Sequence, residues 1–433
     1  MIIYVVQTGD TIQSIANKFG VSETRLIQEN GLQIPTDLVI GQSIVITDPK
    51  EVHIVSDGDT LEEIAANYGI PMMQLYRNNP YLMEREYIYP GEELIISYNT
   101  KATIATNAYA FPYINREILR KSLPYLTYLS ILNYNTLKGG KIESYYDDSD
   151  LIKMAKEYGV LPLMLLTSAT FRGECSPEMV YELLINTEYQ DNHAQNMIKV
   201  LKEKGYYGVN ITITFLSKTN DELYLNYLKR ITSHLNKEGY PVFITIDPNF
   251  SQDENGSLFE EVDYTDYDKL IEETYVMRFF WGTQIGPPMP VSSIENITSY
   301  VNYMKQRIDP NKINIGFPLL GYDWSLPYIP GFTAGNAIAL DSAMELARVM
   351  NSTIQFDLAS ETPYYEYGLE DSEGTSRHIV WFVDARTISA IVNLVLENEL
   401  RGTGLWNIMR YYPQLWLIIN SNFEIQKLLT EGN

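Results

Sequence analysis

The sequence predicts an α/β protein: two βααβ units, followed by a C-terminal (β/α)8 TIM barrel that carries a small α+β insertion. Two observations lead to this prediction. Residues 1–98 contain one pattern written twice, and the rest of the chain alternates apolar, β-rich runs with segments of helical spacing. Eight such runs, the last of them after a long gap, fit a closed parallel barrel with an inserted subdomain.

The N-terminal repeat has a period of about fifty residues. Residues 6–12, Val-Gln-Thr-Gly-Asp-Thr-Ile, recur as Val-Ser-Asp-Gly-Asp-Thr-Leu at 55–61. Residues 15–21 recur at 64–70, and residues 40–46 recur at 90–96. Each copy predicts a strand, a Gly-Asp-Thr turn, two short helices and a closing strand, which gives domains at 1–48 and 51–98.

The turns of this repeat carry helix-capping residues. One side chain of each Asp-Thr pair (Asp10-Thr11 and Asp59-Thr60) suits a helix N-cap, and Gly20 and Gly69 suit the left-handed residue after a helix. The pattern resembles the LysM module, in which two loops bind N-acetylglucosamine-containing glycans. The alternative is that the glycines and capping residues only shape the turns. The glycan-contact positions that the resemblance implies are Gly9, Asp10, Thr11, Ile12, Asn30, Gly31 and Leu32, and Gly58, Asp59, Thr60, Leu61, Asn78, Asn79 and Pro80.

The barrel is predicted over residues 101–433. The gap before its last strand is too long for one helix and contains strand-like runs at 353–356, 364–367 and 379–382. An α+β insertion at about 322–382 accounts for them. The eight predicted barrel strands are 103–110, 126–133, 160–167, 207–215, 242–247, 275–281, 313–318 and 402–406.

The fourth of these strands resembles the catalytic strand of glycoside hydrolase family 18, usually written D-G-x-x-x-D-x-E. Gly208 lies on the glycine, whereas Tyr207, Thr212 and Thr214 stand at the three acids. In the family, the glutamate protonates the glycosidic oxygen, and the aspartate before it holds the substrate N-acetyl group that acts as nucleophile. A threonine hydroxyl does not titrate near neutral pH. The resemblance therefore implies a hydrolase barrel that has lost its chemistry.

A second departure lies at the sixth strand. The family has a V-N-I-M-T-Y-D run there, and Trp281 and Gly282 replace its tyrosine and aspartate. Other family motifs persist at 315–324, 380–386 and 401–406. The combination of two LysM modules and this barrel is similar to the spore cortex-lytic N-acetylglucosaminidases of endospore formers.

Side chains at the carboxyl ends of barrel strands are the candidates for sugar contact. The resemblance implies that Trp406 forms the floor of a cleft, and Asp247 or Asp323 are candidates for a surrogate acid. For each position, the alternative is a purely structural role as a core, strand or turn residue. The predicted substrate-binding residues are Tyr109, Asn133, Thr212, Thr214, Trp281, Tyr322, Asp323 and Trp406.

Composition restricts the partners. The net charge of −23 disfavours nucleic acid and anionic membranes, whereas a neutral glycan is not repelled. No apolar run of about 18 residues occurs, so we expect no membrane span, and the first residues lack a signal-peptide pattern. The four histidines show no metal-ligand spacing and no glycine-rich phosphate loop occurs, so we expect no cofactor.

The main hypothesis is a non-catalytic protein that binds peptidoglycan or chitin-like N-acetylglucosamine oligomers. One alternative is an active N-acetylglucosaminidase with a non-standard acid. Another is an interaction scaffold that contacts other spore-coat proteins. The resemblance implies synthesis in the mother-cell cytoplasm and a final place in the spore cortex or coat.

Overall fold

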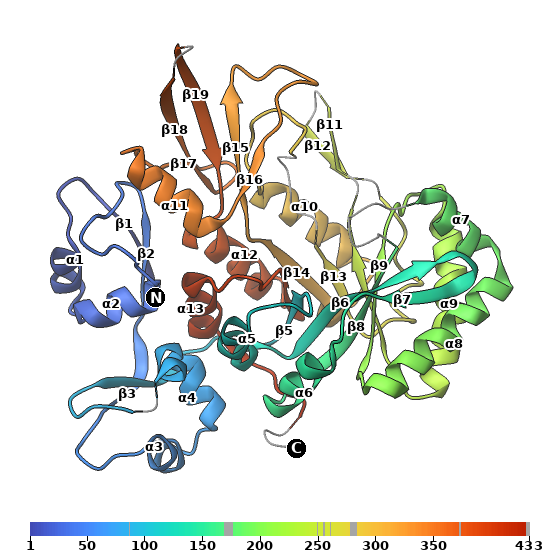
Figure 1. Cartoon of the computed structure of the whole chain (residues 1–433), viewed down its shortest axis with the longest axis horizontal. Helices are drawn as coiled ribbons and strands as arrows, with labels where there is room; N and C mark the ends of the chain where they lie inside the picture. Colours follow the sequence, from blue (N-terminus) through green and yellow to red (C-terminus); the bar gives the residue numbers. More distant parts are fainter. Residues whose placement is uncertain are drawn as a thin grey trace.

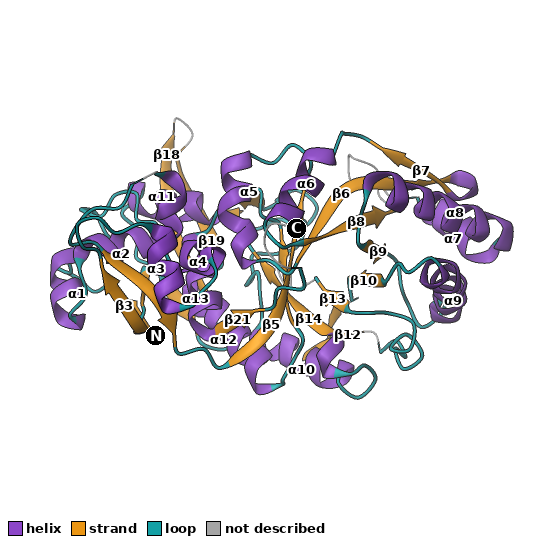
Figure 2. Cartoon of the chain, turned by 90° about the horizontal axis from the view of Figure 1, so that it is seen from below, coloured by secondary structure: helices purple, strands orange, loops and turns teal. Residues whose placement is uncertain are grey.

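The computed structural model describes residues 1–85, 87–168, 176–248, 250–253, 256–259, 261–277, 284–371 and 374–429. Two small repeats lie against one flank of a large barrel, next to its last two helices (Figure 1 and Figure 2). The predicted fold class is confirmed in both parts.

Each repeat is a two-stranded antiparallel sheet with two helices against it. In the first repeat, Ile2 pairs with Ile46 across the sheet, and a small core forms around Ile15, Leu26 and Ile44. The second repeat has an equivalent core around Ile64 and Leu75. The first repeat consists of β1 (Ile2–Val5), α1 (Ile12–Phe19), α2 (Glu23–Asn30) and β2 (Ser43–Ile46); the second consists of β3 (Pro49–Ile54), α3 (Leu61–Tyr68), α4 (Met72–Asn78), the 3-10 helix η1 (Pro80–Glu84) and β4 (Glu93–Tyr98).

Helix ends in the repeats follow the predicted capping. The hydroxyl of Thr11 accepts from the Ser14 backbone N–H, and that of Thr60 accepts from Glu63. The helices end at Gly20 and Gly69 with φ of 69° and 66°, a conformation that glycine adopts without the steric cost of a side chain.

Eight parallel strands close into the barrel, because β5 pairs with both β20 and β6. All eight predicted strands occur. Two of them end away from their predicted ends for a visible reason: β6 runs past residue 133 to pair with a short antiparallel strand, and β9 ends at Ile213, two residues before Phe215 takes a φ of 59°. Residues 278–281 of the predicted sixth strand lie outside the described residues. The strands are β5 (Ala102–Ala110), β6 (Tyr128–Leu137), β8 (Leu161–Thr167), β9 (Gly208–Ile213), β10 (Val242–Ile246), β13 (Thr274–Val276), β14 (Ile313–Pro318) and β20 (Gly402–Trp406).

Helices surround this sheet and bury its outer face, so the strands are apolar on that side. The main helices are α5 (Arg116–Ser122), α6 (Ser149–Glu157), α7 (Pro177–Ile185), α8 (Thr187–Lys204), α9 (Asp221–Lys237), α10 (Ile294–Met304), α12 (Ala385–Glu397) and α13 (Pro413–Asn422). Smaller elements are η2 (Leu123–Tyr125), η3 (Lys138–Gly140), β7 (Lys141–Ser144), β11 (Phe250–Asp253), β12 (Gly256–Phe259), η4 (Pro310–Lys312) and β21 (Phe423–Ile425).

An antiparallel five-stranded sheet stands on the barrel between β14 and α12 (Figure 1). Its strand order is β16-β15-β19-β18-β17, and one helix packs against it through the bond from the Tyr365 hydroxyl to the Ala343 carbonyl. The elements are β15 (Gly321–Leu326), β16 (Asn336–Ile338), α11 (Leu340–Val349), β17 (Gln355–Asp357), β18 (Thr362–Asp371) and β19 (Gly374–Trp381).

Helix α13 docks both repeats onto the barrel. The Gln414 side chain donates to Asn30 Oδ1 at 3.0 Å in the first repeat. Near the other end of the helix, Asn420 donates to Asn78 Oδ1 at 2.9 Å and accepts from Arg77 at 2.8 Å. One helix therefore holds the two repeats through the same type of loop, and this fixes their orientation relative to the barrel.

Candidate functional site

A chain of neutral polar groups crosses the barrel interior. Alternate residues of a strand point inward, so Tyr109, Asn210 and Thr245 meet there from three strands. The Tyr109 hydroxyl lies 2.6 Å from Thr245 Oγ1, and the Asn210 amide donates to Tyr109 at 3.2 Å and to Ser130 at 3.1 Å. Thr245 in turn donates to Asn210 Oδ1 at 2.8 Å. Burial raises the pKa of Tyr109, so it stays neutral. This network lacks a titrating acid.

Thr212 and Thr214, which the sequence analysis predicts at the family's acid positions, carry hydroxyls. Thr212 follows Asn210 on the same side of the strand and is half-buried. The Thr214 hydroxyl lies 2.7 Å from the hydroxyl of Ser168, which follows β8 and was not a sequence candidate. Tyr207 precedes the strand, at the opposite end of the barrel, and burial raises its pKa. Tyr207 is therefore remote from the two threonines.

Trp406 ends β20 and is half-buried, with its ring 5.3 Å from the ring of Tyr109. The thioether of Met277 lies close to Gly316 and Gly404 on two neighbouring strands, where the sequence offered no signal. A Cβ on Gly404 would lie 2.7 Å from Met277 Sδ, and one on Gly316 would lie 2.8 Å from it, so a side chain at either position would force Met277 to shift. The predicted contacts Trp281 and Gly282 lie outside the described residues.

Asn133 and Asp323 already have partners within the protein. The Asn133 oxygen accepts from the backbone N–H groups of Tyr145 and Tyr146, so this amide supports the loop after β7. Asp323 accepts from the Tyr367 hydroxyl at 2.7 Å and lies 3.1 Å from His378 Nδ1. Tyr322 points to the other face of the inserted sheet. Sugar contact by these three side chains stays a prediction.

Two further carboxylates differ in position. Asp247 follows β10 at the carboxyl end of the barrel and is exposed. Glu273 is buried at the amino end, where Arg401 lies 2.6 Å away and Tyr275 and Asn314 each donate at 2.9 Å. Catalytic groups of such barrels lie at the carboxyl end, so Glu273 is a structural group that the sequence did not reveal.

The Gly-Asp-Thr turns of the repeats are exposed and alike. Gly9 and Gly58 have φ of 87° and 90°, so each turn requires glycine. Asp10 accepts from Tyr4 and from the Gln7 backbone, both at 2.7 Å. Asp59 accepts from the Ser56 backbone, which lowers its pKa, with His53 as a second cause. Ile12 and Leu61 pack toward the repeat cores.

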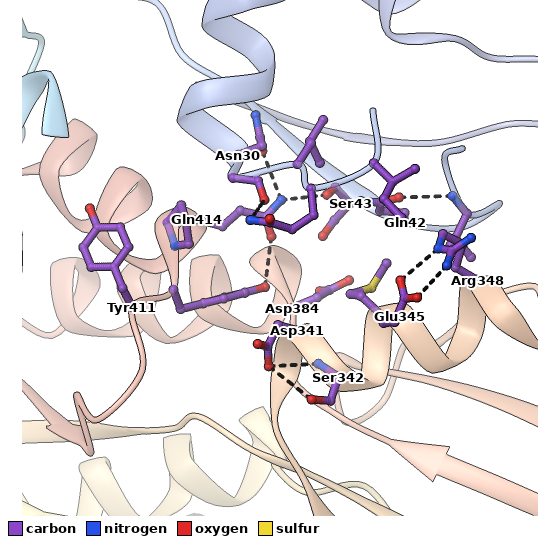
Figure 3. Close-up of a pocket in the computed structure, with 18 of the residues that line it drawn as sticks. Asn30, Gln42, Ser43, Asp341, Ser342, Glu345, Arg348, Asp384, Tyr411 and Gln414 are labelled. Carbon is purple, nitrogen blue, oxygen red and sulfur yellow. Dashed lines mark hydrogen bonds and ion pairs between the residues drawn. The ribbon is translucent and has the colours of Figure 1, made fainter. Parts of the chain in front are cut away.

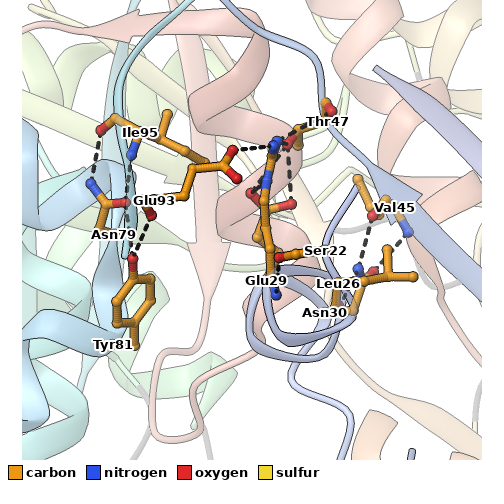
Figure 4. A network of polar contacts seen from close by, with 11 residues as sticks. Ser22, Leu26, Glu29, Asn30, Val45, Thr47, Asn79, Tyr81, Glu93 and Ile95 are labelled. Carbon is orange, nitrogen blue, oxygen red and sulfur yellow. Dashed lines mark hydrogen bonds and ion pairs between the residues drawn. The ribbon is translucent and has the colours of Figure 1, made fainter. Parts of the chain in front are cut away.

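The second loop of each repeat, which follows α2 or α4, faces the barrel. Asn79 accepts from the Ile95 N–H at 2.8 Å and donates to the carbonyls of Leu75 and Ile95, and Asn30 makes the equivalent bonds in the first repeat (Figure 4). A Cβ on Gly31 would lie 2.5 Å from a side-chain atom of Pro413, which shows how closely this loop meets the barrel. Glycan contact by these loops stays a prediction for Asn30, Gly31, Leu32, Asn78, Asn79 and Pro80. The side-chain amides of the three asparagines are buried, so other atoms of the loops would have to make the contact.

The two repeats are also fixed to each other. Arg25 donates to Glu29 at 2.9 Å, to Thr47 at 2.5 Å and to Glu93 of the second repeat at 3.0 Å (Figure 4). Only a short segment, Thr47 and Asp48, separates β2 from β3. The two exposed turns are therefore presented as a pair in a set orientation.

Comparison with known protein families assigns both the barrel and the two repeats to a family. Residues 173–410 match the model of glycosyl hydrolases family 18, and residues 4–47 and 53–97 match the LysM domain. The chain belongs to family 18 of the glycosyl hydrolases. These matches indicate binding to an N-acetylglucosamine-containing glycan such as peptidoglycan.

The similarity to particular proteins covers the whole chain. The cortical fragment-lytic enzyme of Bacillus subtilis (strain 168) is 30% identical over 99% of both chains, and that of Bacillus anthracis is 29% identical over 98% of this chain and 99% of its own. The crystal structure of the Bacillus megaterium QM B1551 spore cortex-lytic enzyme SleL superposes with a TM-score of 0.79, at 31% identity over 99% of both chains.

Two classes of site are not found in the described part of the chain. Its helices include none with both the length and the apolar character needed to cross a bilayer. Its His, Cys, Asp and Glu side chains form no group of three or more that could hold a metal ion.

Proposed function

We propose that this chain binds N-acetylglucosamine-rich peptidoglycan or chitin-like oligomers without hydrolysing them. The observation that carries the proposal is the pair of hydroxyls, Thr212 and Thr214, at the positions of the family's aspartate and glutamate. A hydroxyl does not protonate a glycosidic oxygen near neutral pH, and loss of a general acid costs about 10²–10⁴-fold in rate. The neutral network of Tyr109, Asn210 and Thr245 supplies no substitute acid.

Glycan binding requires fewer specialised contacts than glycan hydrolysis does. A hydrolase needs contacts that strengthen in the transition state, whereas a binding protein needs only contacts to the ground state. The half-buried ring of Trp406 offers sugar C–H groups an oriented apolar face. The two LysM domains add a pair of weak sites on the same chain, and such linkage raises avidity for a polymer without any new contact.

The names of the relatives support a setting in the spore. Proteins similar along the full chain are named spore cortex-lytic enzymes and cortical fragment-lytic enzymes. We therefore place this protein in the spore cortex or coat, after synthesis in the mother cell, and other spore-coat proteins are candidate neighbours.

Titration with N-acetylglucosamine oligomers, followed by tryptophan fluorescence, tests the barrel's share of binding. Binding at roughly −4 to −6 kcal/mol is expected, which is millimolar to tens of micromolar. Trp406→Ala should weaken it at least tenfold, whereas Tyr181→Ala, at an exposed position on α7, should leave it unchanged. If no oligomer binds, the protein is a scaffold; if Trp406→Ala binds like the parent, the barrel does not use this ring.

One observation favours an active enzyme as the second candidate. Asp247 is an exposed carboxylate at the carboxyl end of β10. Turnover that Asp247→Asn abolishes would establish that function. Asp323 is a weaker candidate acid because Tyr367 and His378 already engage it.

A further inference from the structure

A large cleft lies between the repeats and the barrel, and its lining includes none of Thr212, Thr214 and Trp406. Its volume is about 1150 Å³. One wall is the segment 28–43 of the first repeat, and Pro80–Glu84 of the second repeat closes one side. The other wall is α11 of the inserted sheet with the segment 411–414 (Figure 3). We call this space the inter-module cleft.

The charge pattern of the cleft selects an uncharged ligand. Arg348 is paired with Glu345 at 2.5 Å and with Asp37 at 3.0 Å. The other charged lining groups are paired too, as Asp341 with Arg410, Asp384 with Arg386 and Glu84 with Lys121. An ionic ligand would compete with these pairs, whereas a neutral ligand leaves all of them intact.

The surfaces between the ion pairs suit a sugar chain. Ile34 and Val349 expose 40% and 59% of their area from opposite walls, which gives apolar faces for the C–H groups of a pyranose ring. Gln33 and Ser342 supply half-buried or exposed donors and acceptors for hydroxyl and acetamido groups. Pockets for small ligands measure about 300–1000 Å³, so this cleft has room for more than one sugar.

The cleft also borders the loop that follows α2 in the first LysM domain. Asn30, Gly31 and Leu32 of the first LysM domain line it, and Gln414 ties this loop to the barrel. The exposed Gly-Asp-Thr turn does not line the cleft. The surface between loop and barrel therefore exists only where module and barrel meet.

From the paired charges, the apolar faces and this continuity, we propose that the inter-module cleft binds a neutral oligomer of N-acetylated amino sugar between the first LysM domain and α11. The inference rests on the proposed glycan-binding function and adds a second site to it. A glycan strand held there contacts both modules at once, so their fixed docking is part of the site.

Calorimetric titration of the full chain with N-acetylchitohexaose tests the proposal. Ser342→Trp fills the cleft from α11 and should weaken binding at least tenfold. The matched control Ser233→Trp places the same side chain at an exposed position on α9, far from the repeats (Figure 1), and should bind within twofold of the parent. Val349→Asp, which is exposed and leaves the fold intact, should weaken binding at least threefold.

The outcomes separate the two proposals. If the parent does not bind the hexamer, glycan binding and the cleft proposal both fail. If the parent binds, and Ser342→Trp and Val349→Asp bind as tightly as Ser233→Trp, glycan binding stands and the inter-module cleft is excluded as a site.

Discussion

At the scale of the residue, the asparagines of the repeats show what a sequence pattern conceals. Asn30 and Asn79 stand in glycine- or proline-flanked loops, which is typical of exposed, ligand-contacting turns. In the structure both are buried and satisfy backbone groups of the adjacent strand. Both are bonded to the closing strand of their repeat, and Asn30 is also bonded to Gln414 of α13, so these neighbours are not local in sequence.

Asn79→Ala should therefore destabilise the protein. The change removes the acceptor of the Ile95 N–H and the side-chain donor to the Ile95 and Leu75 carbonyls, of which the Leu75 carbonyl keeps the Asn79 backbone N–H. Each unsatisfied group costs about 1–3 kcal/mol, so we expect a loss of about 2–4 kcal/mol in the free energy of unfolding, measured by urea denaturation. The exposed Asn67→Ala is the control and should change little. Equal stability of the two variants would show that the Asn79 contacts are dispensable.

His193 gives the protein a predictable pH dependence. It is buried against Tyr227, its ring nitrogens have no hydrogen-bond partner among the described residues, and burial lowers its pKa to about 3. The unfolded chain, with a pKa of about 6.5, binds one more proton between these values, so stability falls as pH falls. From pH 7 to 5 the loss from this group should be about 2 kcal/mol.

Urea denaturation at both pH values, on the parent and on His193→Gln, measures this contribution. The variant should lose about 2 kcal/mol less than the parent on acidification. The same pH dependence in His193→Gln and parent would contradict the assignment.

At the scale of the element, the sequence predicts strands better than it predicts their ends. The strands of a parallel barrel are buried on both faces, so they appear as apolar runs between helices, and all eight were found. The extension of β6 depends on its hairpin with β7, and the early end of β9 depends on the backbone turn at Phe215. Such features come from pairing and turn geometry and leave no hydrophobic signal.

The site was predictable to a similar degree. The positions of Thr212, Thr214 and Trp406 at strand ends followed from the family frame. Met277 and Ser168 did not, because their roles come from neighbouring strands: Met277 fills space that Gly316 and Gly404 leave open, and Ser168 pairs with Thr214.

Restoring the acids of β9 alone should not restore activity. In Thr212→Asp/Thr214→Glu, the new glutamate displaces the Thr214–Ser168 contact, and Trp281 and Gly282 still replace the family's tyrosine and aspartate. Release of fluorophore from a 4-methylumbelliferyl chitobioside should stay at least 10²-fold below that of an active family member. Full activity of the double variant would show that the sixth strand matters less than we argue.

At the scale of the whole molecule, docking on α13 converts three modules into one body. Arg77 is buried at this contact, where it donates to Asn420 and lies 3.6 Å from Glu424. Both partners belong to the barrel domain, on α13 and β21, so we expect Arg77 to help hold the second repeat against the barrel.

Arg77→Ala should release the second repeat while leaving the first one docked through Gln414. Limited proteolysis should then cut near residues 98–101 at least tenfold faster than in the parent, because the linker opens to solvent. Arg120→Ala, on the exposed side of α5, is the control and should be cut at the parental rate. Unchanged proteolysis of Arg77→Ala would place the docking energy elsewhere.

The central claim is that this protein holds cortex glycan without cutting it. Incubation of the full chain with purified spore cortex, with fragments read by mass spectrometry and bound protein measured by sedimentation, tests both halves together. The account predicts that the protein sediments with the cortex while no glycan fragment rises above background. Steady release of N-acetylglucosamine-terminated fragments, lost in Asp247→Asn, would contradict it.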